Sequence, residues 1–454
     1  MFARRRRVAG FSAACYCAFL TTQPRGLVVQ GNCDAQFFVF DPAASQKAII
    51  SGRIVDDEVI AYTPQGYYSA TFEGAHFVHV AFPGLEGVHS FAQFAKTLDR
   101  ADVIRSIIEA RRTRFPEPNL LPPPKLRMDI VGDVQGDIAV NIRAESESGL
   151  SRIEIYADGR LEQSHDATGT RVEQVFRLRR ASHWRQLSAI AIDADGYRSR
   201  SETIDLPDAS APSNVLHFLA VGIDDYKNAK LAKLKFAKRD AQTLNRTLTQ
   251  PQNYYGKVTA KIELDGGASS QRILSNLQEM VSSARPEDTV LLFFAGHGGR
   301  SSDGRYYLML SETDPDQLSG TALDWSSVVR VLDAAKARVV VLIDACHSGQ
   351  TGKIKTSNDD AMAGIAGGGA MVVLAASKGR QFSEELAATG GGVFTQTLAS
   401  ILTEQRQTAD TNRNGTLEIS ELYRSLKSVV TSATAGRQSP WVVRRNFVGD
   451  APLF

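Results

Sequence analysis

The chain has 454 residues, of which 43% are hydrophobic, and its formal net charge at neutral pH is +2. This length predicts two to four globular domains, and the nearly balanced charge gives no indication of a nucleic-acid partner or an acidic one. The cysteine spacing excludes a zinc finger, a CxxC motif and a disulfide scaffold. The four cysteines are Cys15, Cys17, Cys33 and Cys346.

Residues 1–36 are expected to be a signal-like or disordered N-terminus. The basic stretch "MFARRRR" precedes about thirteen mostly apolar residues, which is typical of a signal peptide and too short to span a bilayer comfortably. Because of this signal-like stretch, we expect an exported or periplasmic protein, although no clear A-x-A cleavage site follows. The alternative is a cytoplasmic protein whose start codon is poorly chosen or whose tail is disordered. No later stretch is apolar enough to predict a transmembrane helix.

Residues 37–125 are predicted to contain short strands, a helix and a linker. Runs such as "FFVF" and "KAIISGRIV" indicate strands over 37–80, and the spacing of apolar residues predicts a helix within 87–114. The stretch "FPEPNLLPPPK" has too many prolines for a helix or a central strand, so we expect a stiff linker there.

Residues 126–208 alternate between polar and apolar positions, as in "DIAVNIRAES" and "SRIEIYADGR". Strand-like alternation interrupted by "ADGR" and "DADGY" turns predicts an antiparallel sandwich of immunoglobulin-like size, without the cysteine pair of antibody domains. A module of this kind is a spacer or a docking surface.

From Val215 onward, continuous apolar strands alternate with amphipathic helices. Strands that are apolar on both faces are typical of sheets covered by helices on both sides. We therefore predict an α/β domain over 213–454, with a doubly wound, mostly parallel sheet.

Two of these buried strands end in reactive residues. "LLFFAGHGG" carries His297, and "VVVLIDACHSG" carries Cys346. Because ligands bind at the carboxyl ends of strands in open α/β sheets, both side chains are expected at one edge. An imidazole favours the nucleophilic thiolate, and the N–H groups of Gly298 and Cys346 could form an oxyanion hole. Taken singly, "GHGG" could be a turn and Cys346 a core thiol. His347 is the rival histidine, but its side chain should point elsewhere.

The motifs "FFAGHG" and "LIDACHSG", with the histidine about 50 residues before the cysteine, resemble those of the caspase-like cysteine peptidases. "AVGIDDYKNAKLAKLKFAKRDA" and "AASKGRQFSEE" place the resemblance in the metacaspase and bacterial orthocaspase branch, over roughly 213–454. It implies a caspase-like fold, a catalytic dyad of His297 and Cys346, and an acyl-enzyme. The chemistry would need no cofactor, and the substrates would be proteins or peptides. The segment "IAYTPQGYYSATFEGAHFVHVAF" resembles the tail of WD-repeat propellers and suggests a propeller remnant.

Two carboxylates bear on specificity. Asp344 lies two residues before the nucleophile, where animal caspases have glutamine, and strand alternation predicts that it shares the Cys346 cleft. The resemblance implies that Asp240 supplies a second carboxylate to the S1 pocket and that Ser377 also binds substrate. Such a pocket should accept Arg or Lys at P1 and reject Asp. The structural alternatives are a solvated Asp240 that pairs with Arg239 or Lys238, and a strand-end cap for Asp344.

The same preference predicts self-cleavage. Residues 350–369 are polar and glycine-rich, as exposed loops that proteases cut are. By the resemblance they lie at the junction between large and small subunits. Lys353 and Lys355 are the candidate cleavage sites.

The stretch "DTNRNGTLEISE", residues 410–421, fits the spacing of an EF-hand calcium loop. Its glycine at position six is Gly415. An isolated loop lacks its usual partner, so an Asx-rich helix cap is the alternative to a calcium site. The candidate ligands are Asp410, Asn412, Asn414, Thr416 and Glu421.

Together these features predict a cysteine endopeptidase behind an all-β accessory region that could dock partners. A scaffold of the same fold without activity is the main alternative, although it would need neither His297 nor Cys346. A hydrolase of small amides is a third.

Overall fold

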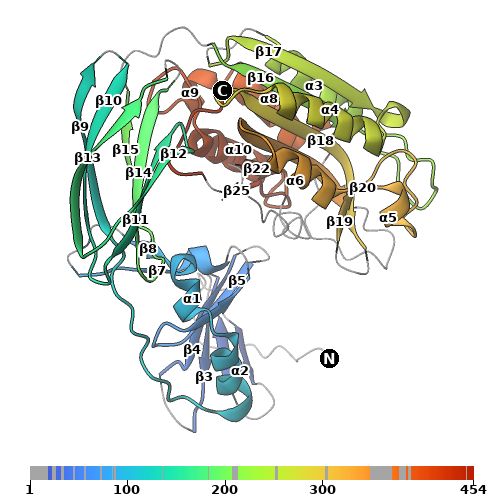
Figure 1. Ribbon diagram of the computed structural model, residues 1–454. Coiled ribbons are helices and arrows are strands. Elements are labelled where there is room, and N and C mark those ends of the chain that lie inside the picture. The colour runs from blue at the N-terminus through green and yellow to red at the C-terminus, as the bar shows by residue number, and fades with distance from the viewer. Residues whose placement is uncertain are drawn as a thin grey trace.

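The computed structural model describes residues 19–22, 27–31, 35–43, 47–55, 58–71, 74–83, 85, 88–134, 136–181, 184–206, 213–250, 254–301, 305–347, 371–377, 385–386, 390–445 and 447–454. Three units follow one another along the chain (Figure 1). A small N-terminal sheet is followed by a β-sandwich, and the sandwich by a larger α/β domain.

The N-terminal unit is a six-stranded antiparallel sheet in which each strand pairs with the next along the chain. Its strands are β1 (Phe19–Thr22), β2 (Val28–Gly31), β3 (Gln36–Phe40), β4 (Ile50–Val55), β5 (Glu58–Tyr62) and β6 (Tyr68–Ala70). The sheet thus begins within the segment for which the sequence predicts a signal or disorder. The short elements that follow are η1 (Gly74–Phe77), β7 (His79–Val80), β8 (His89–Ser90) and η2 (Phe91–Phe94).

The single helix predicted within 87–114 is wrong, because the chain leaves the helix at Asp99 and Arg100. Asp99 forms a bridge with Tyr68, and the Arg100 N–H donates to the Tyr68 carbonyl at 2.7 Å. This pairing with the sheet separates α1 (Ala95–Leu98) from α2 (Ala101–Ala110). Residues 111–124, which contain the prolines, form neither helix nor strand.

The sandwich consists of two antiparallel sheets with strand orders β13-β10-β9 and β12-β11-β14-β15. Its interior is apolar and includes Ile142, Ile155 and Leu187. The strands are β9 (Lys125–Val134), β10 (Asp137–Glu145), β11 (Leu150–Ala157), β12 (Arg160–Asp166), β13 (Arg171–Arg179), β14 (Gln186–Asp193) and β15 (Glu202–Asp205).

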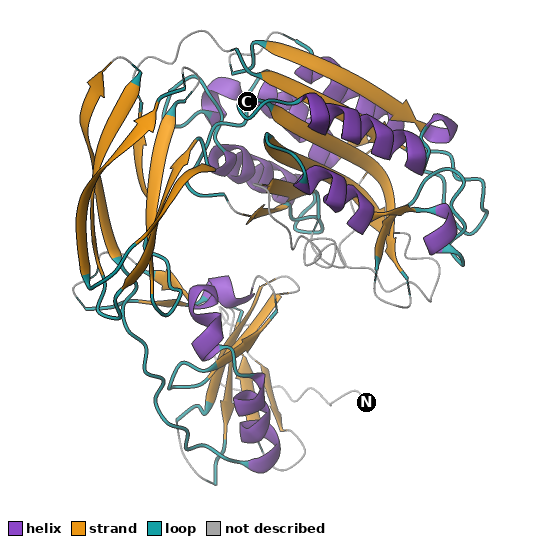
Figure 2. Ribbon diagram, viewed as in Figure 1, coloured by secondary structure: helices purple, strands orange, loops and turns teal. Residues whose placement is uncertain are grey.

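The α/β domain contains a mixed sheet with the order β17-β16-β18-β21-β22-β25. Figure 2 shows the strands of this sheet with helices beside them. The first five strands are parallel and β25 is antiparallel, so the sheet is mostly parallel as predicted. The strands are β16 (Val215–Gly222), β17 (Lys257–Leu264), β18 (Thr289–Arg300), β19 (Tyr306–Leu308), β20 (Leu323–Asp324), β21 (Arg338–His347), β22 (Met371–Ala375), β23 (Glu385–Leu386), β24 (Gly391–Gly392) and β25 (Trp441–Arg445). The helices are α3 (Ala237–Leu248), η3 (Asp265–Gly267), α4 (Ser270–Ser283), α5 (Leu318–Thr321), α6 (Trp325–Asp333), α8 (Val393–Leu402), α9 (Arg406–Ala409) and α10 (Ile419–Ala433).

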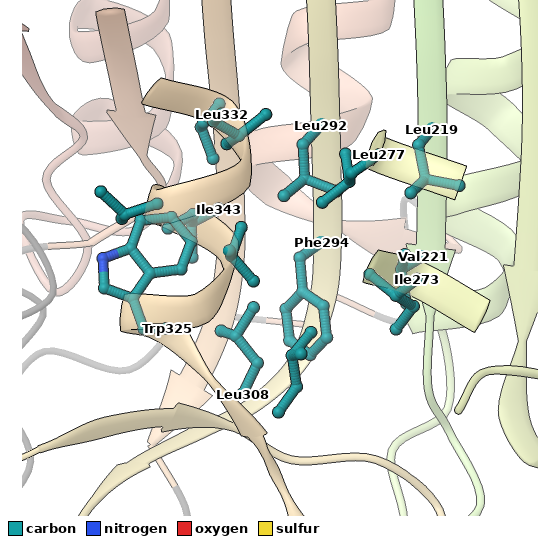
Figure 3. Packing of buried hydrophobic residues seen from close by; sticks show 14 of the residues in the cluster. Leu219, Val221, Ile273, Leu277, Leu292, Phe294, Leu308, Trp325, Leu332 and Ile343 are labelled. Carbon is teal, nitrogen blue, oxygen red and sulfur yellow. The ribbon is translucent and has the colours of Figure 1, made fainter. Parts of the chain in front are cut away.

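Helices cover both faces of this sheet, because successive strand residues point to opposite sides. On one face, Leu292 and Phe294 of β18 pack with Ile273 and Leu277 of α4 and Leu332 of α6 (Figure 3). Helices α3, α8 and α10 pack on the other face. This packing fixes the positions of the central strands and therefore of the residues at their ends.

Residues 447–454 connect the α/β domain to the sandwich. Val448 packs with Tyr156 and Ile190 of the sandwich, and its N–H donates to the Gly159 carbonyl at 3.3 Å. Further along, Arg338 of β21 donates from Nη1 to the Pro452 carbonyl at 2.6 Å. The last residues of the chain therefore contact both units. No helix in the described ranges is long and apolar enough to cross a membrane.

Candidate active site

The topological switch point of the sheet lies at the carboxyl ends of β16 and β18. The chain leaves β16 through α3 toward β17 on one side, whereas β18 lies on the other side of β16. Loops that follow such neighbouring strands diverge, and ligands bind in the crevice between them. His297 lies near the end of β18, at this edge.

The backbone register brings His297 and Cys346 together. β18 and β21 are parallel neighbours, and their pairing aligns His297 with Cys346 and Gly298 with His347. The prediction that both residues of the dyad emerge at one edge therefore agrees with their backbones. The side chains of Cys346 and His347 lie outside the described part of the structure.

His297 is 3% exposed, and its ring has a defined partner. Nε2 lies 2.7 Å from the carbonyl oxygen of Ala232, in the loop between β16 and α3. A carbonyl can only accept, so Nε2 carries the hydrogen and Nδ1 of the neutral ring carries the lone pair. Nδ1 is therefore the atom that can take a proton at this site.

Gly298, a predicted oxyanion donor, continues β18 beyond His297. It pairs with Leu308 of β19 on one side and with His347 of β21 on the other. Its position beside the predicted dyad is compatible with the predicted role, which stays a prediction.

Asp240 and Asp344 converge at the start of α8, where Gly392, the residue before the helix, lies between their carboxylates. Asp240 accepts from the Gly392 N–H at 2.9 Å, and Asp344 accepts from the Thr395 hydroxyl at 2.8 Å. A Cβ added to Gly392 would lie 2.9 Å from an oxygen of each carboxylate. The two predicted pocket residues are thus neighbours, buried at 3% and 6% exposure.

The solvated alternative for Asp240 is wrong, because this side chain is buried and Lys238 pairs with Asp265 at 2.7 Å instead. The strand-end cap for Asp344 stays an alternative, because the hydrogen bond that its carboxylate accepts comes from the Thr395 hydroxyl in the first turn of α8. Ser377, two residues beyond β22, is fully buried. Lys353 and Lys355, the candidate self-cleavage sites, lie outside the described residues.

The loop 410–421 is held by its own polar side chains. Glu421 Oε1 accepts from the Thr411 N–H at 2.7 Å and from the Asn412 N–H at 3.2 Å. Asp410 accepts from the N–H groups of Asn414 at 3.1 Å and Gly415 at 2.8 Å. Both carboxylates therefore turn inward. Within the described ranges, no three His, Cys, Asp or Glu side chains are grouped to hold a metal ion.

The loop 410–421 has no second EF-hand loop beside it in the sequence, but its backbone pairs with the last residues of the chain. The Leu417 N–H donates to the Phe454 carbonyl at 2.6 Å, and the Leu453 N–H donates back to the Leu417 carbonyl at 2.8 Å. Because this pairing joins residues more than 30 positions apart, the sequence pattern of the loop did not reveal it.

Glu418 is a second buried carboxyl in this loop that the sequence analysis missed, although it occupies position nine of the motif. Burial and the neighbouring Glu421 raise the pKa of Glu418 to about 7. Burial opposes ionisation of Glu421 too, but its hydrogen bonds from Glu418 and Thr411 hold the pKa of that carboxyl below its usual range. The pair therefore shares one proton near neutral pH.

Comparison with known proteins identifies the family. The family model described as "Caspase domain" matches residues 217–451, more than half of the chain. The chain therefore belongs to the caspase-domain family of cysteine peptidases, whose members need no cofactor for catalysis and act on proteins or peptides.

Solved structures give weaker similarities. The protein GSU0716 from Geobacter sulfurreducens is 15% identical, with 51% of this chain and 93% of that chain covered and a TM-score of 0.37. Caspase-1 from Spodoptera frugiperda is 17% identical, with 51% and 88% covered and a TM-score of 0.32. No curated protein matches the chain. The family assignment rests on the domain match.

Proposed function

We propose that this protein is a cysteine endopeptidase that uses His297 and Cys346 as a catalytic dyad. The observation that carries the proposal is the register of β18 and β21, which aligns the two residues at adjacent strand ends. The Cys346 thiolate attacks the peptide carbonyl carbon, and the C–N bond breaks as His297 gives a proton to the leaving amine. Water then hydrolyses the thioester, and the thiol is restored.

We place the protein in the metacaspase and orthocaspase branch, on the basis of the motifs around the dyad and the two buried carboxylates. Asp240 and Asp344 give the proposed S1 pocket two negative charges. The pocket therefore favours Arg or Lys at P1 and repels Asp.

The specificity is tested by profiling the purified protein against a peptide library, with and without calcium. We expect cleavage after Arg and Lys. Asp344→Asn and Asp240→Asn should each lower kcat/KM for Arg substrates about tenfold or more, because a charged hydrogen-bonding partner is lost. Glu404→Gln, on the exposed surface of the same domain, is the control. A P1 Asp preference, or a profile unchanged in Asp344→Asn, would refute the pocket. Cleavage of small amides only would favour the other hydrolase class.

Self-processing follows from the same preference. Mass spectrometry should show the wild-type protein cut after Lys353 or Lys355 and Cys346→Ala intact. An uncut wild-type chain would overturn self-processing and leave the dyad assignment standing.

We further propose that the loop 410–421 binds calcium. The motif spacing, the inward-turned Glu421 and the pairing of Leu417 with the end of the chain support this. Calcium binding would have to draw together the carboxylates of Asp410, Glu418 and Glu421, which are not grouped as a metal site in the described structure, with the side-chain oxygens of Asn412 and Asn414. The Thr416 carbonyl would complete the set.

Millimolar calcium should raise the thermal midpoint, because a ligand that binds only the folded state stabilises it. Glu421→Ala should remove the rise, whereas Glu404→Ala should keep it. Since the ion displaces the proton of Glu418, the rise should be larger at pH 8 than at pH 6. If calcium does not raise the thermal midpoint of the wild type, the helix-cap alternative for this loop holds.

The raised pKa of Glu418 also predicts a pH effect without calcium. A carboxyl whose pKa is higher in the folded state stabilises the fold at low pH, and this contribution is lost as the pH rises through about 7. Between pH 5 and pH 8, the wild-type thermal midpoint should therefore fall relative to that of Glu418→Gln. Parallel pH curves would contradict the buried, shared proton.

A further inference from the structure

Tyr226 contacts His297 in two ways from the loop that joins β16 to α3. Its hydroxyl oxygen accepts a hydrogen bond from the His297 backbone N–H, with an N···O distance of 2.8 Å. Its ring centroid lies 4.7 Å from that of the imidazole, and the ring planes are inclined by 34°. Tyr226 is 2% exposed, so both contacts are shielded from water.

Gly296 makes room for this hydroxyl. A Cβ at Gly296 would lie 2.9 Å from the Tyr226 oxygen, closer than real Cβ atoms stand to their neighbours, and a tight 3.0 Å from the Phe294 ring. The sequence analysis gave no role to Tyr226, although the residue lies in the quoted motif "AVGIDDYKNAK". The structure thus links the first glycine of "GHGG" to this tyrosine.

The residues on both sides of Tyr226 are fixed. The N–H groups of Asp224 and Asp225 donate to Asp265 Oδ1 at 2.8 and 2.9 Å, and the Lys227 N–H donates to the Ser311 carbonyl at 2.9 Å. The same loop supplies the Ala232 carbonyl to His297 Nε2. A well-anchored loop therefore contacts both the backbone and the ring of the histidine.

We propose that Tyr226 is a positioning residue for His297. It holds the backbone of the histidine and the plane of the imidazole, so that Nε2–H stays on the Ala232 carbonyl and Nδ1 is available at the strand end. This inference rests on the proposed peptidase function, because the dyad gives the orientation of His297 its importance.

Removal of the hydroxyl leaves the buried N–H of His297 without its acceptor. The histidine would shift to find another, and a displacement of about 1 Å in a catalytic group can reduce the rate about 100-fold. Tyr226→Phe should therefore lower kcat about 10- to 100-fold, while KM changes less than about twofold. Tyr226→Leu, which also loses the ring, should lower kcat further.

Tyr255→Phe is the matched control. Tyr255 is also buried in the α/β domain, and its hydroxyl donates to the Leu453 carbonyl at 2.8 Å, away from the dyad. Its kcat should stay near the wild-type value even if its thermal midpoint falls as much as that of Tyr226→Phe. Equal losses of kcat in the two variants would show a structural role only.

Gly296→Ala tests the contact from the other side. The added methyl group should displace the hydroxyl and lower kcat about as much as Tyr226→Phe does. Because Tyr226→Phe removes the atom that the methyl group meets, the double mutant should lose less than the product of the two single effects. Fully multiplicative losses would refute the link.

The tautomer of His297 gives a readout that does not depend on turnover. The measurement is made at a pH high enough for the ring to be neutral, and the imidazole nitrogen-15 signals are assigned by comparison with His297→Ala. The shifts of the wild type should show one tautomer, with the hydrogen on Nε2. Tyr226→Leu should show a mixture of tautomers. Unchanged shifts in Tyr226→Leu would overturn the positioning role, whether or not the wild type cleaves peptides. A wild type that cleaves no peptide would refute the proposed function alone.

Discussion

Replacement of Cys346 by alanine will reduce kcat/KM for peptides with Arg at P1 by at least about 10⁴-fold, because the acyl-enzyme cannot form without the thiol. His297→Ala should come close to this loss, since the imidazole supplies the proton for the leaving amine. The backbones of the two residues are paired across adjacent strands. Steady-state hydrolysis of a fluorogenic peptide measures both effects.

The double mutant should lose little more than Cys346→Ala alone, because residues that act as a unit are not additive. Cys33→Ala is the cysteine control and should keep full activity. Peptide hydrolysis that persists in Cys346→Ala would show that another residue is the nucleophile.

Replacement of Arg338 by alanine will lower the free energy of unfolding more than the other proposed substitutions. Arg338 is 5% exposed at the start of β21, and its guanidinium donates to the Pro452 carbonyl at 2.6 Å and to the Tyr254 hydroxyl at 2.7 Å. It also faces Asp158 of the sandwich, whose Oδ2 has no hydrogen-bond partner among the described residues. The loss should be about 3–5 kcal/mol, because a buried countercharge disappears. The thermal midpoint of the α/β domain would fall by on the order of 10 °C.

Two variants separate this effect from a general loss of charge. Lys261→Ala removes an ion pair with Glu279 at the surface, and we expect less than about 1 kcal/mol. Asp158→Asn should recover part of the loss in the Arg338→Ala background, because the uncompensated carboxylate is gone. Differential scanning calorimetry reports each midpoint. A midpoint within 2 °C or so of the wild type in Arg338→Ala would contradict the buried-charge argument.

The sequence allowed the α/β domain and the dyad to be predicted because their signals are strong and local. Continuous apolar runs identify buried strands, and the residues that follow them must emerge at the carboxyl edge. For His297 and Cys346, the strand ends alone therefore predicted proximity. The resemblance added Asp240, which is 3% exposed and lies near Asp344 beside Gly392.

Contacts between distant segments could not be predicted from the sequence. The break at Asp99 depends on Tyr68, and the apolar periodicity of α1 and α2 does not reveal it. Similarly, Arg338 looks like a polar flank of the "VVVLIDAC" strand, but it is buried under the last residues of the chain. The anchoring of His297 by Tyr226 depends on how the loop between β16 and α3 meets β18, and no sequence spacing predicts that contact.

The most direct test of the central claim is covalent labelling of the wild-type protein with an acyloxymethyl ketone that carries Arg at P1, followed by tryptic mass mapping. The dyad predicts one adduct per chain on Cys346, strongly reduced labelling in His297→Ala, and slower labelling when Asp replaces Arg in the probe. An adduct on another cysteine, or labelling of Cys346 at the same rate in His297→Ala, would contradict the assignment of these two residues as the catalytic pair.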